Sequence, residues 1–529
     1  MTRRIIMKSK NLDKYYGVQE FERITFGELI ENLGCLYENK IAIKDQQGCA
    51  TYAELDKDSN RVRQKLVKLG IHSGDIVILQ CKNTIYFIKI LFALFKLGAV
   101  PVLVLPAYRE QEILKIVEKT KATAYIAPNE YLGFQYINIV NALKRSVKDI
   151  FCLLINDTFV DCEKEESISI DLRNPVEYDD VAVLLMSGGT TGEPKLIPRT
   201  HADYIYNAKM AAKRSRLNQD SVYLAALPIA HNMPLACPGI LGTLCAGGTV
   251  ILSYYSSPDE IMDLIEQERV TITGLVPTLA QLCLELLQID SFDVSSLEVI
   301  ISGGARLDTK LAEDIINNFH CVLQNQFGTA EGLILSTALD DPVEWTMRYQ
   351  GKPISEADKV RIINEMGNDV SDGEDGELIV MGPYTIEGYY NEQKNREKFT
   401  ENGFYRTGDR ARFEEGGNIR ILGRMVEQIN RAGEKIQPSE IEEALIGISG
   451  IQSVIVVAIE DSLLGQRSCA FIQLISGYHL DEKKIYSEIQ KKGIVRYKIP
   501  DQIEFVDEWP VTKMGKIDIN KLKKKVTGK

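Results

Sequence analysis

The segment V-A-V-L-L-M-S-G-G-T-T-G-E-P-K, residues 181–195, joins an apolar run to a loop rich in glycine and hydroxyl side chains. The run at 181–186 predicts a buried strand. The loop after it offers backbone N–H groups, hydroxyls and the Lys195 ammonium, which are groups that bind phosphate. It is not a Walker A loop, because E-P separates Gly192 from Lys195. An ordinary surface loop is the alternative, and the rest of the chain decides between the two.

The 529-residue chain has the composition of a globular protein and an acidic balance of charge. Apolar residues make up 45% and charged residues 26%, which are ordinary values. The 62 basic and 74 acidic side chains give a net charge of −12, which argues against a general binder of nucleic acid or anionic membranes. The ten cysteines form no C-x-x-C pair and the N-terminus shows no apolar signal segment, so we expect a cytoplasmic protein.

Strand and helix patterns alternate along the first part of the chain. Apolar runs at 76–79, 100–105 and 124–127 alternate with helical patterns at 52–69, 86–97 and 110–120. The same alternation returns with strands at 222–227, 249–252, 271–276 and 299–302. Strand, helix, strand with short connections is typical of a parallel sheet that is covered on both faces. We therefore expect an α/β fold.

The most apolar stretch, residues 85–105, has a second interpretation as a membrane span. Lys89 and Lys96 add charge to it, and Gly98 and Pro101 interrupt it. The pattern therefore favours an amphipathic helix followed by a buried strand.

The pattern changes twice toward the C-terminus. Short strands and glycine turns at 360–422 predict a small β-rich subdomain. From residue 423 onward, two helices and two strands predict a compact α+β domain. The predicted domains are therefore residues 1–422 and residues 423–529.

Several dispersed clusters carry groups suited to nucleotide chemistry. F-G-T-A-E-G at 327–332 places Thr329 and Glu331 where a hydroxyl could meet a phosphate oxygen and a carboxylate could bind magnesium. Y-R-T-G-D at 405–409 ends on a carboxylate suited to the ribose hydroxyls, and G-R at 423–424 adds an arginine. T-K-M-G-K at 512–516 sets Lys516 after a glycine. Each cluster alone has an ordinary alternative: a simple turn for the first two, and an exposed side chain for Arg424 and Lys516.

These motifs, in this order and spacing, resemble the adenylate-forming superfamily over nearly the whole chain. The resemblance implies a large N-terminal domain of two α/β subdomains plus a small β-barrel, followed by a small mobile α+β C-terminal domain. It implies a two-step reaction, in which a carboxylate attacks the α-phosphate of ATP-Mg²⁺ and a thiol then takes the acyl group from the adenylate.

The resemblance also assigns roles to single residues. Lys516 would bridge the substrate carboxylate and the α-phosphate, where it stabilises charge in the transition state. Thr329 would contact phosphate and Glu331 would bind Mg²⁺. The implied ATP-binding residues are Ser187, Gly188, Gly189, Thr190, Thr191, Gly192 and Lys195 for the outer phosphates, Gly303, Gly304, Ala305, Arg306 and Gly328 around adenine and phosphate, and Asp409 and Arg424 at the ribose.

A closer similarity is to the stand-alone aryl-acid–AMP ligases that prime siderophore synthesis by nonribosomal peptide machinery. It is carried by L-I-P-R-T-H-A-D-Y-I-Y at 196–206, Y-L-A-A-L-P-I-A-H-N-M-P-L-A-C-P-G at 223–239, G-E-K-I at 433–436 and Y-K-I-P-D at 497–501. In such enzymes the A-H-N turn lines the aryl pocket. The similarity therefore implies that Asn232 contacts the ortho hydroxyl of the acid and that His231 lies near its carboxylate.

The pocket residues bear on which acid is used. Cys237 stands where dihydroxybenzoate ligases have serine, and the salicylate ligases resemble this chain at that position. Ile334 is larger than the valine that is usual in the dihydroxybenzoate ligases. Both residues therefore favour salicylate over 2,3-dihydroxybenzoate. Met233 and Gln326 depart from the expected aromatic and apolar residues. Gln326 either faces the ring or turns outward, and both alternatives stay open. Val426 removes a polar contact expected at the domain hinge.

The acceptor and the function class have alternatives. The few residues after Lys516 hold no carrier domain, so we expect an aryl carrier protein in trans, whose phosphopantetheine arm supplies the thiol. An aryl-CoA ligase acting on coenzyme A is the nearest alternative. A nucleotide-binding regulatory protein without catalysis is a third, and the presence of Lys516, Glu331 and Asp409 argues against it.

Overall fold

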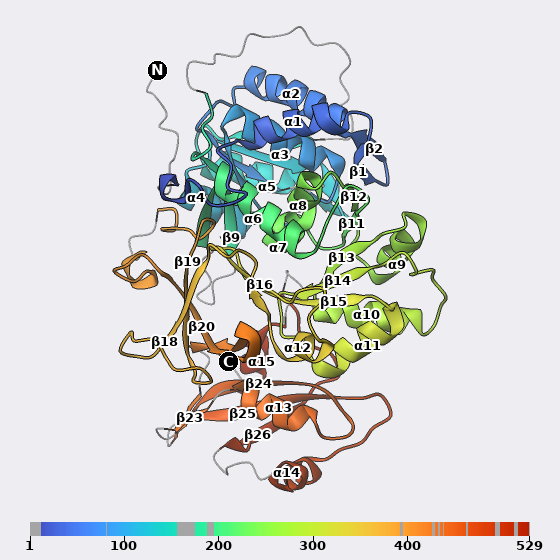
Figure 1. The fold of residues 1–529 in the computed structure, drawn as a ribbon, viewed down its shortest axis with the longest axis vertical. Coiled ribbons are helices and arrows are strands. Elements are labelled where there is room, and N and C mark those ends of the chain that lie inside the picture. Colours follow the sequence, from blue (N-terminus) through green and yellow to red (C-terminus); the bar gives the residue numbers. More distant parts are fainter. Residues whose placement is uncertain are drawn as a thin grey trace. The chain divides into compact units, whose positions relative to one another are not determined.

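A computed structural model describes most of the chain. The described residues are 12–80, 82–155, 175–187, 195–391, 395–425, 429–431, 434–436, 438–461, 464–491, 498–512 and 517–527. They divide into two compact units. The first comprises Met1–Val360 with Val380–Tyr405, and the second comprises Arg361–Ile379 with Arg406–Lys529. Figure 1 traces both units along the chain.

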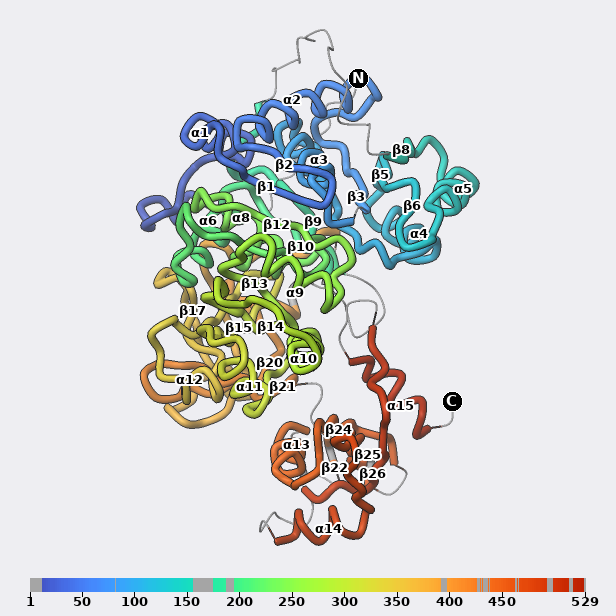
Figure 2. The backbone as a smooth tube through the Cα atoms, turned by 90° about the vertical axis from the view of Figure 1, so that its right-hand side faces the viewer, coloured from blue at the N-terminus to red at the C-terminus, as the bar shows by residue number. Residues whose placement is uncertain are grey.

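One sheet of the first unit carries the predicted phosphate loop. Its strand order is β10-β9-β4-β3-β5-β8. In that order the strands are Lys195–Thr200, Val181–Ser187, Val100–Leu103, Ile76–Leu79, Ala124–Pro128 and Phe151–Ile155. Neighbouring strands run parallel except β10 and β9, which form an antiparallel pair. Helices α4 (Glu110–Thr120) and α5 (Ile137–Ser146) pack together beside β5 and β8 (Figure 2).

The most apolar stretch forms a helix followed by a buried strand, as predicted, but the helix is buried on nearly all sides and the expected amphipathic character is wrong. Helix α3 (Ile85–Leu97) is followed by β4 after the left-handed Gly98. Its two lysines are ion-paired to α2 (Tyr52–Lys68), with Lys89 Nζ 2.7 Å from Asp58 and Lys96 Nζ 2.6 Å from Asp56. Across the described part of the chain, no helix combines the length and apolar character that a bilayer crossing needs.

A second sheet of the first unit has the strand order β17-β16-β15-β14-β13-β11-β12-β1-β2. In that order the strands are Lys352–Pro353, Leu333–Ser336, Val322–Thr329, Val299–Gly303, Ile272–Leu275, Val222–Ala225, Thr249–Leu252, Ile41–Asp45 and Gly48–Thr51. The strands from β15 to β1 are parallel, and the flanking pairs are antiparallel. The parallel sheet expected from the alternating pattern is confirmed.

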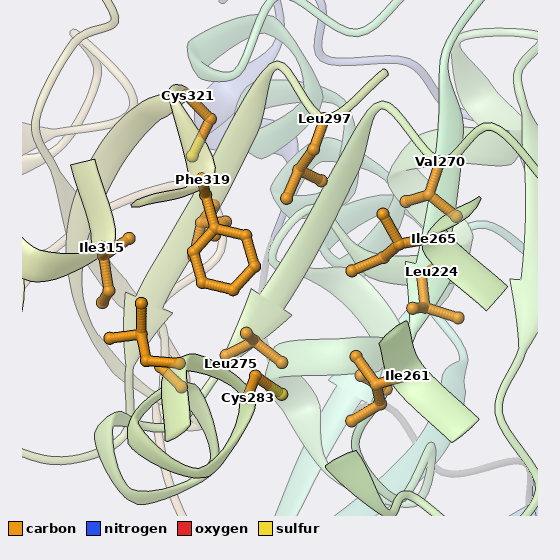
Figure 3. Close-up of a cluster of buried hydrophobic side chains, with 14 of the residues drawn as sticks. Leu224, Ile261, Ile265, Val270, Leu275, Cys283, Leu297, Ile315, Phe319 and Cys321 are labelled. Carbon is orange, nitrogen blue, oxygen red and sulfur yellow. The ribbon is translucent and has the colours of Figure 1, made fainter. Parts of the chain in front are cut away.

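The remaining elements of the first unit cover these sheets or connect them. They are α1 (Phe26–Tyr37), α6 (His201–Arg214), α7 (Asn232–Ala236), α8 (Gly239–Cys245), α9 (Pro258–Gln267), α10 (Pro277–Leu287), α11 (Thr309–Phe319), α12 (Val343–Arg348), and the hairpin of β6 (Glu130–Tyr131) and β7 (Phe134–Gln135). Figure 3 shows the core of the second sheet, where Leu224 and Leu275 from strands meet Ile261, Cys283 and Phe319 from helices. The side chain of Phe319 is 2% exposed, so this core is closed to water.

The second unit contains most of the β-rich subdomain and the α+β domain that the sequence predicts near the C-terminus. Strands β18 (Lys359–Ile363), β19 (Gly376–Met381), β20 (Tyr405–Phe413) and β21 (Ile419–Arg424) form a sheet in that order, and the unit division passes through the first three. A further sheet has the order β23-β22-β25-β24, with β26 on β25. Its elements are β22 (Ile429–Arg431), β23 (Glu434–Ile436), β24 (Ile451–Asp461), β25 (Gly465–Leu474) and β26 (Gln502–Phe505), with helices α13 (Pro438–Ile446), α14 (Glu482–Lys491) and α15 (Ile519–Thr527).

Local sequence signals fix where several helices begin. Thr25, Thr51 and Thr200 each accept a hydrogen bond from the backbone N–H three residues on, and the acidic side chain at that position returns the bond. This reciprocal cap satisfies N–H groups that lack partners at a helix start. The cap at Thr200 sets the start of α6 directly after β10. Helix α6 therefore follows strand β10, whose first residue, Lys195, ends the predicted phosphate loop.

His201, the first residue of α6, gives the fold a predictable response to acid. The side chain is 1% exposed, and its Nδ1 accepts a hydrogen bond from the Phe26 backbone N–H at 3.2 Å. Burial lowers the pKa of His201 from 6.5 to about 3. The neutral ring therefore contributes stability that is present above pH 6.5 and is lost as the pH falls toward 3, because only the unfolded chain takes up the proton in that window.

We predict that His201→Asn, which keeps an acceptor near Nδ1, loses less stability in acid than the wild type. Between pH 6.5 and pH 4 the difference in free energy of unfolding should shift by roughly 3 kcal/mol in favour of the variant. Urea unfolding of both proteins across this range measures it. A difference that stays constant with pH would contradict the assignment of a buried, neutral imidazole.

Candidate active site

The predicted phosphate loop begins and ends on paired residues of one hairpin. Ser187, the last residue of β9, is paired in register with Lys195, the first residue of β10. Gly188, Gly189, Thr190, Thr191 and Gly192 lie outside the described residues. The two ends of the loop are thus held together by the sheet, and Lys195 stands at its exit. The Lys195 Nζ lies 4.8 Å from the centroid of the Tyr389 ring.

The T-A-E turn closes the neighbouring hairpin of the second sheet. Thr329 ends β15, and its Oγ1 accepts a hydrogen bond from the Leu333 N–H at 3.3 Å as β16 begins. Gly332 between them has a φ of +112°, and a Cβ there would lie 1.9 Å from the Tyr384 carbonyl oxygen. Only glycine fits this turn. The predicted Gly328, Thr329 and Glu331 are therefore brought together on one tight connection.

The Glu331 carboxylate is held by a tyrosine that the sequence analysis did not identify. Tyr389 donates its hydroxyl proton to Glu331 Oε1 at 2.8 Å, and its oxygen lies 3.1 Å from the Tyr405 hydroxyl. Glu331 is 7% exposed and Tyr389 is 4% exposed. Burial, followed by the negative charge of Glu331, raises the pKa of Tyr389, so its hydroxyl keeps the proton at neutral pH.

The residues at this turn fit a magnesium ion that is shared with a nucleotide. Within the described ranges, no group of three or more His, Cys, Asp or Glu side chains is placed to hold a metal ion. Mg²⁺ commonly takes one or two protein carboxylates and completes its shell with substrate phosphates and water. Glu331 supplies one such carboxylate. Thr329 stands two residues before it and supplies a hydroxyl.

The A-H-N turn opens helix α7 and orders a short chain of polar contacts. His231 is the N-cap residue, and Asn232 begins the helix. The Tyr204 hydroxyl donates to Asn232 Oδ1 at 2.8 Å, and Asn232 Nδ2 donates to Cys237 Sγ at 3.3 Å. Burial raises the pKa of Cys237 to about 12, so it remains a neutral thiol. The amide of Asn232 is thus held between a tyrosine and a cysteine.

Met233 lies against two strand glycines of the second sheet. A Cβ on Gly274 would lie 3.2 Å from Met233 Cε, and one on Gly303 would lie 3.4 Å from the same atom. Gly303 on β14 pairs in register with Gln326 on β15. Gln326 is 7% exposed and is therefore buried in the absence of a ligand.

Cys237 and Ile334 belong to one buried cluster. The cluster also contains Tyr206, Met210 and Tyr384, and Ile334 is fully buried. The two residues that the sequence analysis linked to substrate size therefore pack in the same cluster. The structure brings them together with Asn232, which donates to Cys237.

A fully buried arginine ties helix α7 to the T-A-E turn. Arg199 on β10 donates to Asp203 Oδ1 at 2.8 Å, to Asn207 Oδ1 at 3.3 Å and to the Ala330 carbonyl at 3.2 Å. Asn207 in turn donates to the Ala236 carbonyl at 2.7 Å in helix α7. The arginine also stacks over the Tyr204 ring at 4.6 Å. One guanidinium thus contacts the residue before Glu331 and the tyrosine that holds Asn232.

The predicted ribose residues meet in the second unit. Asp409 on β20 pairs in register with Arg424 on β21, and Arg424 Nε lies 3.1 Å from Asp409 Oδ1. The Asp409 N–H donates to Thr407 Oγ1 at 3.0 Å. Gly304, Ala305 and Arg306 follow β14 in the first unit and are exposed. Lys516 and the hinge residue Val426 lie outside the described residues.

Comparisons with known proteins identify the family. A family model described as AMP-binding enzyme matches residues 36–390, and one described as AMP-binding enzyme C-terminal domain matches residues 440–516. The chain belongs to the AMP-binding enzyme family. The resemblance to the adenylate-forming superfamily is thereby confirmed, and the chain is an adenylate-forming ligase.

Relatives of this family match the chain almost from end to end. The 2,3-dihydroxybenzoate-AMP ligase of Bacillus subtilis (strain 168) is 42% identical over 513 residues, which cover 96% of this chain and 94% of the relative. The salicyl-AMP ligase / salicyl-S-ArCP synthetase of Mycobacterium tuberculosis (strain H37Rv) is 35% identical over 505 residues, which cover 93% of this chain and 89% of the relative. The apo structure of MbtA from Mycobacterium smegmatis has a TM-score of 0.74 and 34% identity, with 98% of both chains covered.

These matches also confirm the predicted fold class. The α/β architecture with a large N-terminal and a small C-terminal domain is that of the family. Three residues of the site were missed by the sequence analysis: Arg199, Tyr204 and Tyr389. Arg199 and Tyr204 lie within the 196–206 motif, but Arg199 is on strand β10 and Asp203 is in helix α6, so helical spacing gave no signal for their ion pair. The family motifs also contain no signal for the contact of Tyr389 with Glu331.

We predict that Arg199→Met destabilises the protein by about 3–5 kcal/mol, because it leaves the Asp203 carboxylate buried without its ion-pair partner. Asp203 is 1% exposed and cannot recruit water in place of the arginine. The shift in the urea unfolding midpoint measures the effect. Arg216→Met, which breaks the exposed pair with Asp340, is the control and should leave the midpoint nearly unchanged. Equal shifts in both variants would refute the structural role of the buried pair.

Proposed function

We propose that this ligase activates a 2-hydroxybenzoate-type acid, with salicylate favoured and 2,3-dihydroxybenzoate next. A carboxylate oxygen attacks the α-phosphorus of ATP-Mg²⁺, pyrophosphate leaves, and an aryl-AMP remains. The phosphopantetheine thiol of an aryl carrier protein then attacks the acyl carbon, and AMP leaves. The names of the two relatives, a 2,3-dihydroxybenzoate-AMP ligase and a salicyl-AMP ligase, support an aryl acid. A cytoplasmic location belongs to the same proposal.

The observation that carries the proposal is the Tyr204–Asn232–Cys237 chain of contacts. Asn232 Oδ1 accepts from Tyr204 and its Nδ2 donates to Cys237, which fixes the amide in one orientation. A primary amide has two N–H donors and two acceptor lone pairs, so one of each is left for a ligand. An ortho hydroxyl on a benzoate matches such a fixed amide. Asn232 would thus read the feature that separates a 2-hydroxybenzoate from benzoate.

The cluster of Cys237 and Ile334 argues for the smaller ring. A hydroxyl at position 3 would meet a neutral thiol, which is a poorer hydrogen-bond partner than serine. The Ile334 side chain is fully buried, so the cluster cannot yield easily. Met233 and Gln326 would form the rest of the pocket with Gly303, and His231 would stand near the carboxylate.

The remaining roles follow the family motifs. Ser187 to Lys195 would hold the outer phosphates, Thr329 the phosphate and Glu331 the Mg²⁺. Residues 303–306 and Gly328 would line the nucleotide, Asp409 with Arg424 would hold the ribose, and Lys516 would bridge the carboxylate and the α-phosphate. A domain boundary between residues 422 and 423 is part of the same proposal.

We expect pyrophosphate exchange over a panel of acids to rank salicylate first, then 2,3-dihydroxybenzoate, and to give little exchange with benzoate. Anthranilate and 3-hydroxypicolinate complete the panel and test whether Gln326 selects another substituent or a ring nitrogen. Cys237→Ser should raise the use of 2,3-dihydroxybenzoate relative to salicylate, because it restores a hydroxyl partner. A strong wild-type preference for dihydroxybenzoate would refute the size argument, and absence of exchange with every acid would favour a regulatory protein.

We expect Lys516→Ala to lower the adenylation rate by at least ~10²–10³, since it removes a charge that stabilises the transition state. Transfer from preformed aryl-AMP should fall less, because the α-phosphate bond has already formed. Near-normal pyrophosphate exchange in the variant would exclude the assigned role.

The acceptor is tested separately with preformed aryl-AMP. We expect faster acyl transfer to a phosphopantetheinylated aryl carrier protein than to coenzyme A. The opposite order would identify an aryl-CoA ligase.

A further inference from the structure

One segment of the first unit touches both loops to which the phosphates and the metal are assigned. The segment, residues 385–390, runs past the T-A-E turn and then past β10. The Thr385 hydroxyl donates to the Gly332 carbonyl at 3.0 Å, and the Ile386 N–H donates to the Glu331 carbonyl at 2.9 Å. The Tyr390 N–H donates to the Leu196 carbonyl at 2.9 Å. These hydrogen bonds tie one short segment to the turn between β15 and β16 and to strand β10.

Within this segment, Tyr389 contacts the charged side chain of each loop. Its hydroxyl donates to Glu331 Oε1 at 2.8 Å, and its ring lies 4.8 Å from Lys195 Nζ. These are two different parts of one side chain. The hydroxyl contact involves a hydrogen bond to a carboxylate, and the ring contact is a cation–π interaction. Tyr389 is 4% exposed and Glu331 is 7% exposed, so the hydroxyl contact is shielded from water, whereas Lys195 is half-buried.

We propose that Tyr389 is a positioning residue that presets the Glu331 carboxylate for a divalent cation and the Lys195 ammonium for the outer phosphates of a nucleotide. This inference rests on the proposed function, in which these two groups meet Mg²⁺ and ATP. In this role Tyr389 acts through Glu331 and Lys195 and needs no contact of its own with either ligand.

The chemistry of each group explains why positioning matters. A glutamate and a lysine are long side chains, and ordering them when the ligand arrives costs conformational entropy. Partners that hydrogen-bond a metal ligand orient it, and their removal typically lowers metal affinity by about 10–100-fold. A carboxylate that accepts one hydrogen bond on Oε1 keeps further lone pairs for a metal. The tyrosine therefore orients the Glu331 carboxylate and leaves lone pairs on it for the metal ion.

The test distinguishes the role of the Tyr389 hydroxyl from that of its ring. It measures the affinities of the full-length protein for Mn²⁺ and for ATP. Mn²⁺ serves as a spectroscopic probe for the metal, and its affinity for the enzyme–ATP complex is measured by electron paramagnetic resonance. The affinity for ATP without metal is measured by calorimetry. Tyr389→Phe removes only the hydroxyl, whereas Tyr389→Leu removes the ring as well, with Tyr389→Met as its replacement if the leucine variant does not fold. Tyr390→Phe, which removes the neighbouring hydroxyl and keeps the backbone bond to Leu196, is the matched control.

Tyr389→Phe should lower the Mn²⁺ affinity by about 10–100-fold and leave metal-free ATP affinity nearly unchanged. The leucine or methionine variant should show the same metal defect and a further loss of about 2- to 5-fold in metal-free ATP affinity. Tyr390→Phe should match the wild type in both measurements. A purely structural role would not separate the two affinities in this way.

Two results would overturn the inference. Wild-type Mn²⁺ affinity in Tyr389→Phe would remove the role of the hydroxyl, and equal metal-free ATP affinity in the phenylalanine and leucine variants would remove that of the ring. Both leave the proposed function standing. If the wild-type protein binds no ATP under any of these conditions, the proposed function falls together with the inference.

Discussion

The guanidinium of Arg199 has no solvent exposure, and its charge is compensated by Asp203 and by the Asn207 and Ala330 oxygens. A buried charge is tolerated only where such partners are fixed in place. The arginine therefore holds two elements in place. One is the start of α6, where Asp203 also caps the helix, and the other is the turn that carries Glu331. The turn that carries Glu331 and helix α7, which carries Asn232, are consequently linked by one hydrogen-bonded network within the first unit.

The candidate site has two parts. In the part proposed to bind the acid, Tyr204 and Cys237 hydrogen-bond to the Asn232 amide. In the part proposed to bind the nucleotide, Glu331 and Lys195 are the charged groups, and Tyr389 contacts both. Charged groups that are ordered before the ligand arrives need little reorganisation during the reaction, which is how electrostatic stabilisation becomes effective.

The sequence predicted the elements whose signal is local. The strands at 76–79 and the helix at 110–120 follow from apolar periodicity and have the expected bounds. The positions of Asn232, Cys237 and Ile334 came from the resemblance to a family, and their common location is seen in the structure. The roles of Arg199 and Tyr389 could not be predicted in this way. They depend on contacts between residues 131 and 58 positions apart in the chain, and local periodicity carries no information on such pairs.

The central claim is that the Asn232 amide, held in one orientation, recognises the ortho hydroxyl of an aryl acid by hydrogen bonding. The most direct measurement is the affinity of the protein for non-hydrolysable salicyl-adenylate and benzoyl-adenylate analogues, which differ only in that hydroxyl. Calorimetry should show that the wild type binds the salicyl compound about tenfold more tightly or better, as one hydrogen bond in a buried site provides, and that Asn232→Leu loses the difference. Equal affinity of the wild-type protein for both compounds would contradict the account.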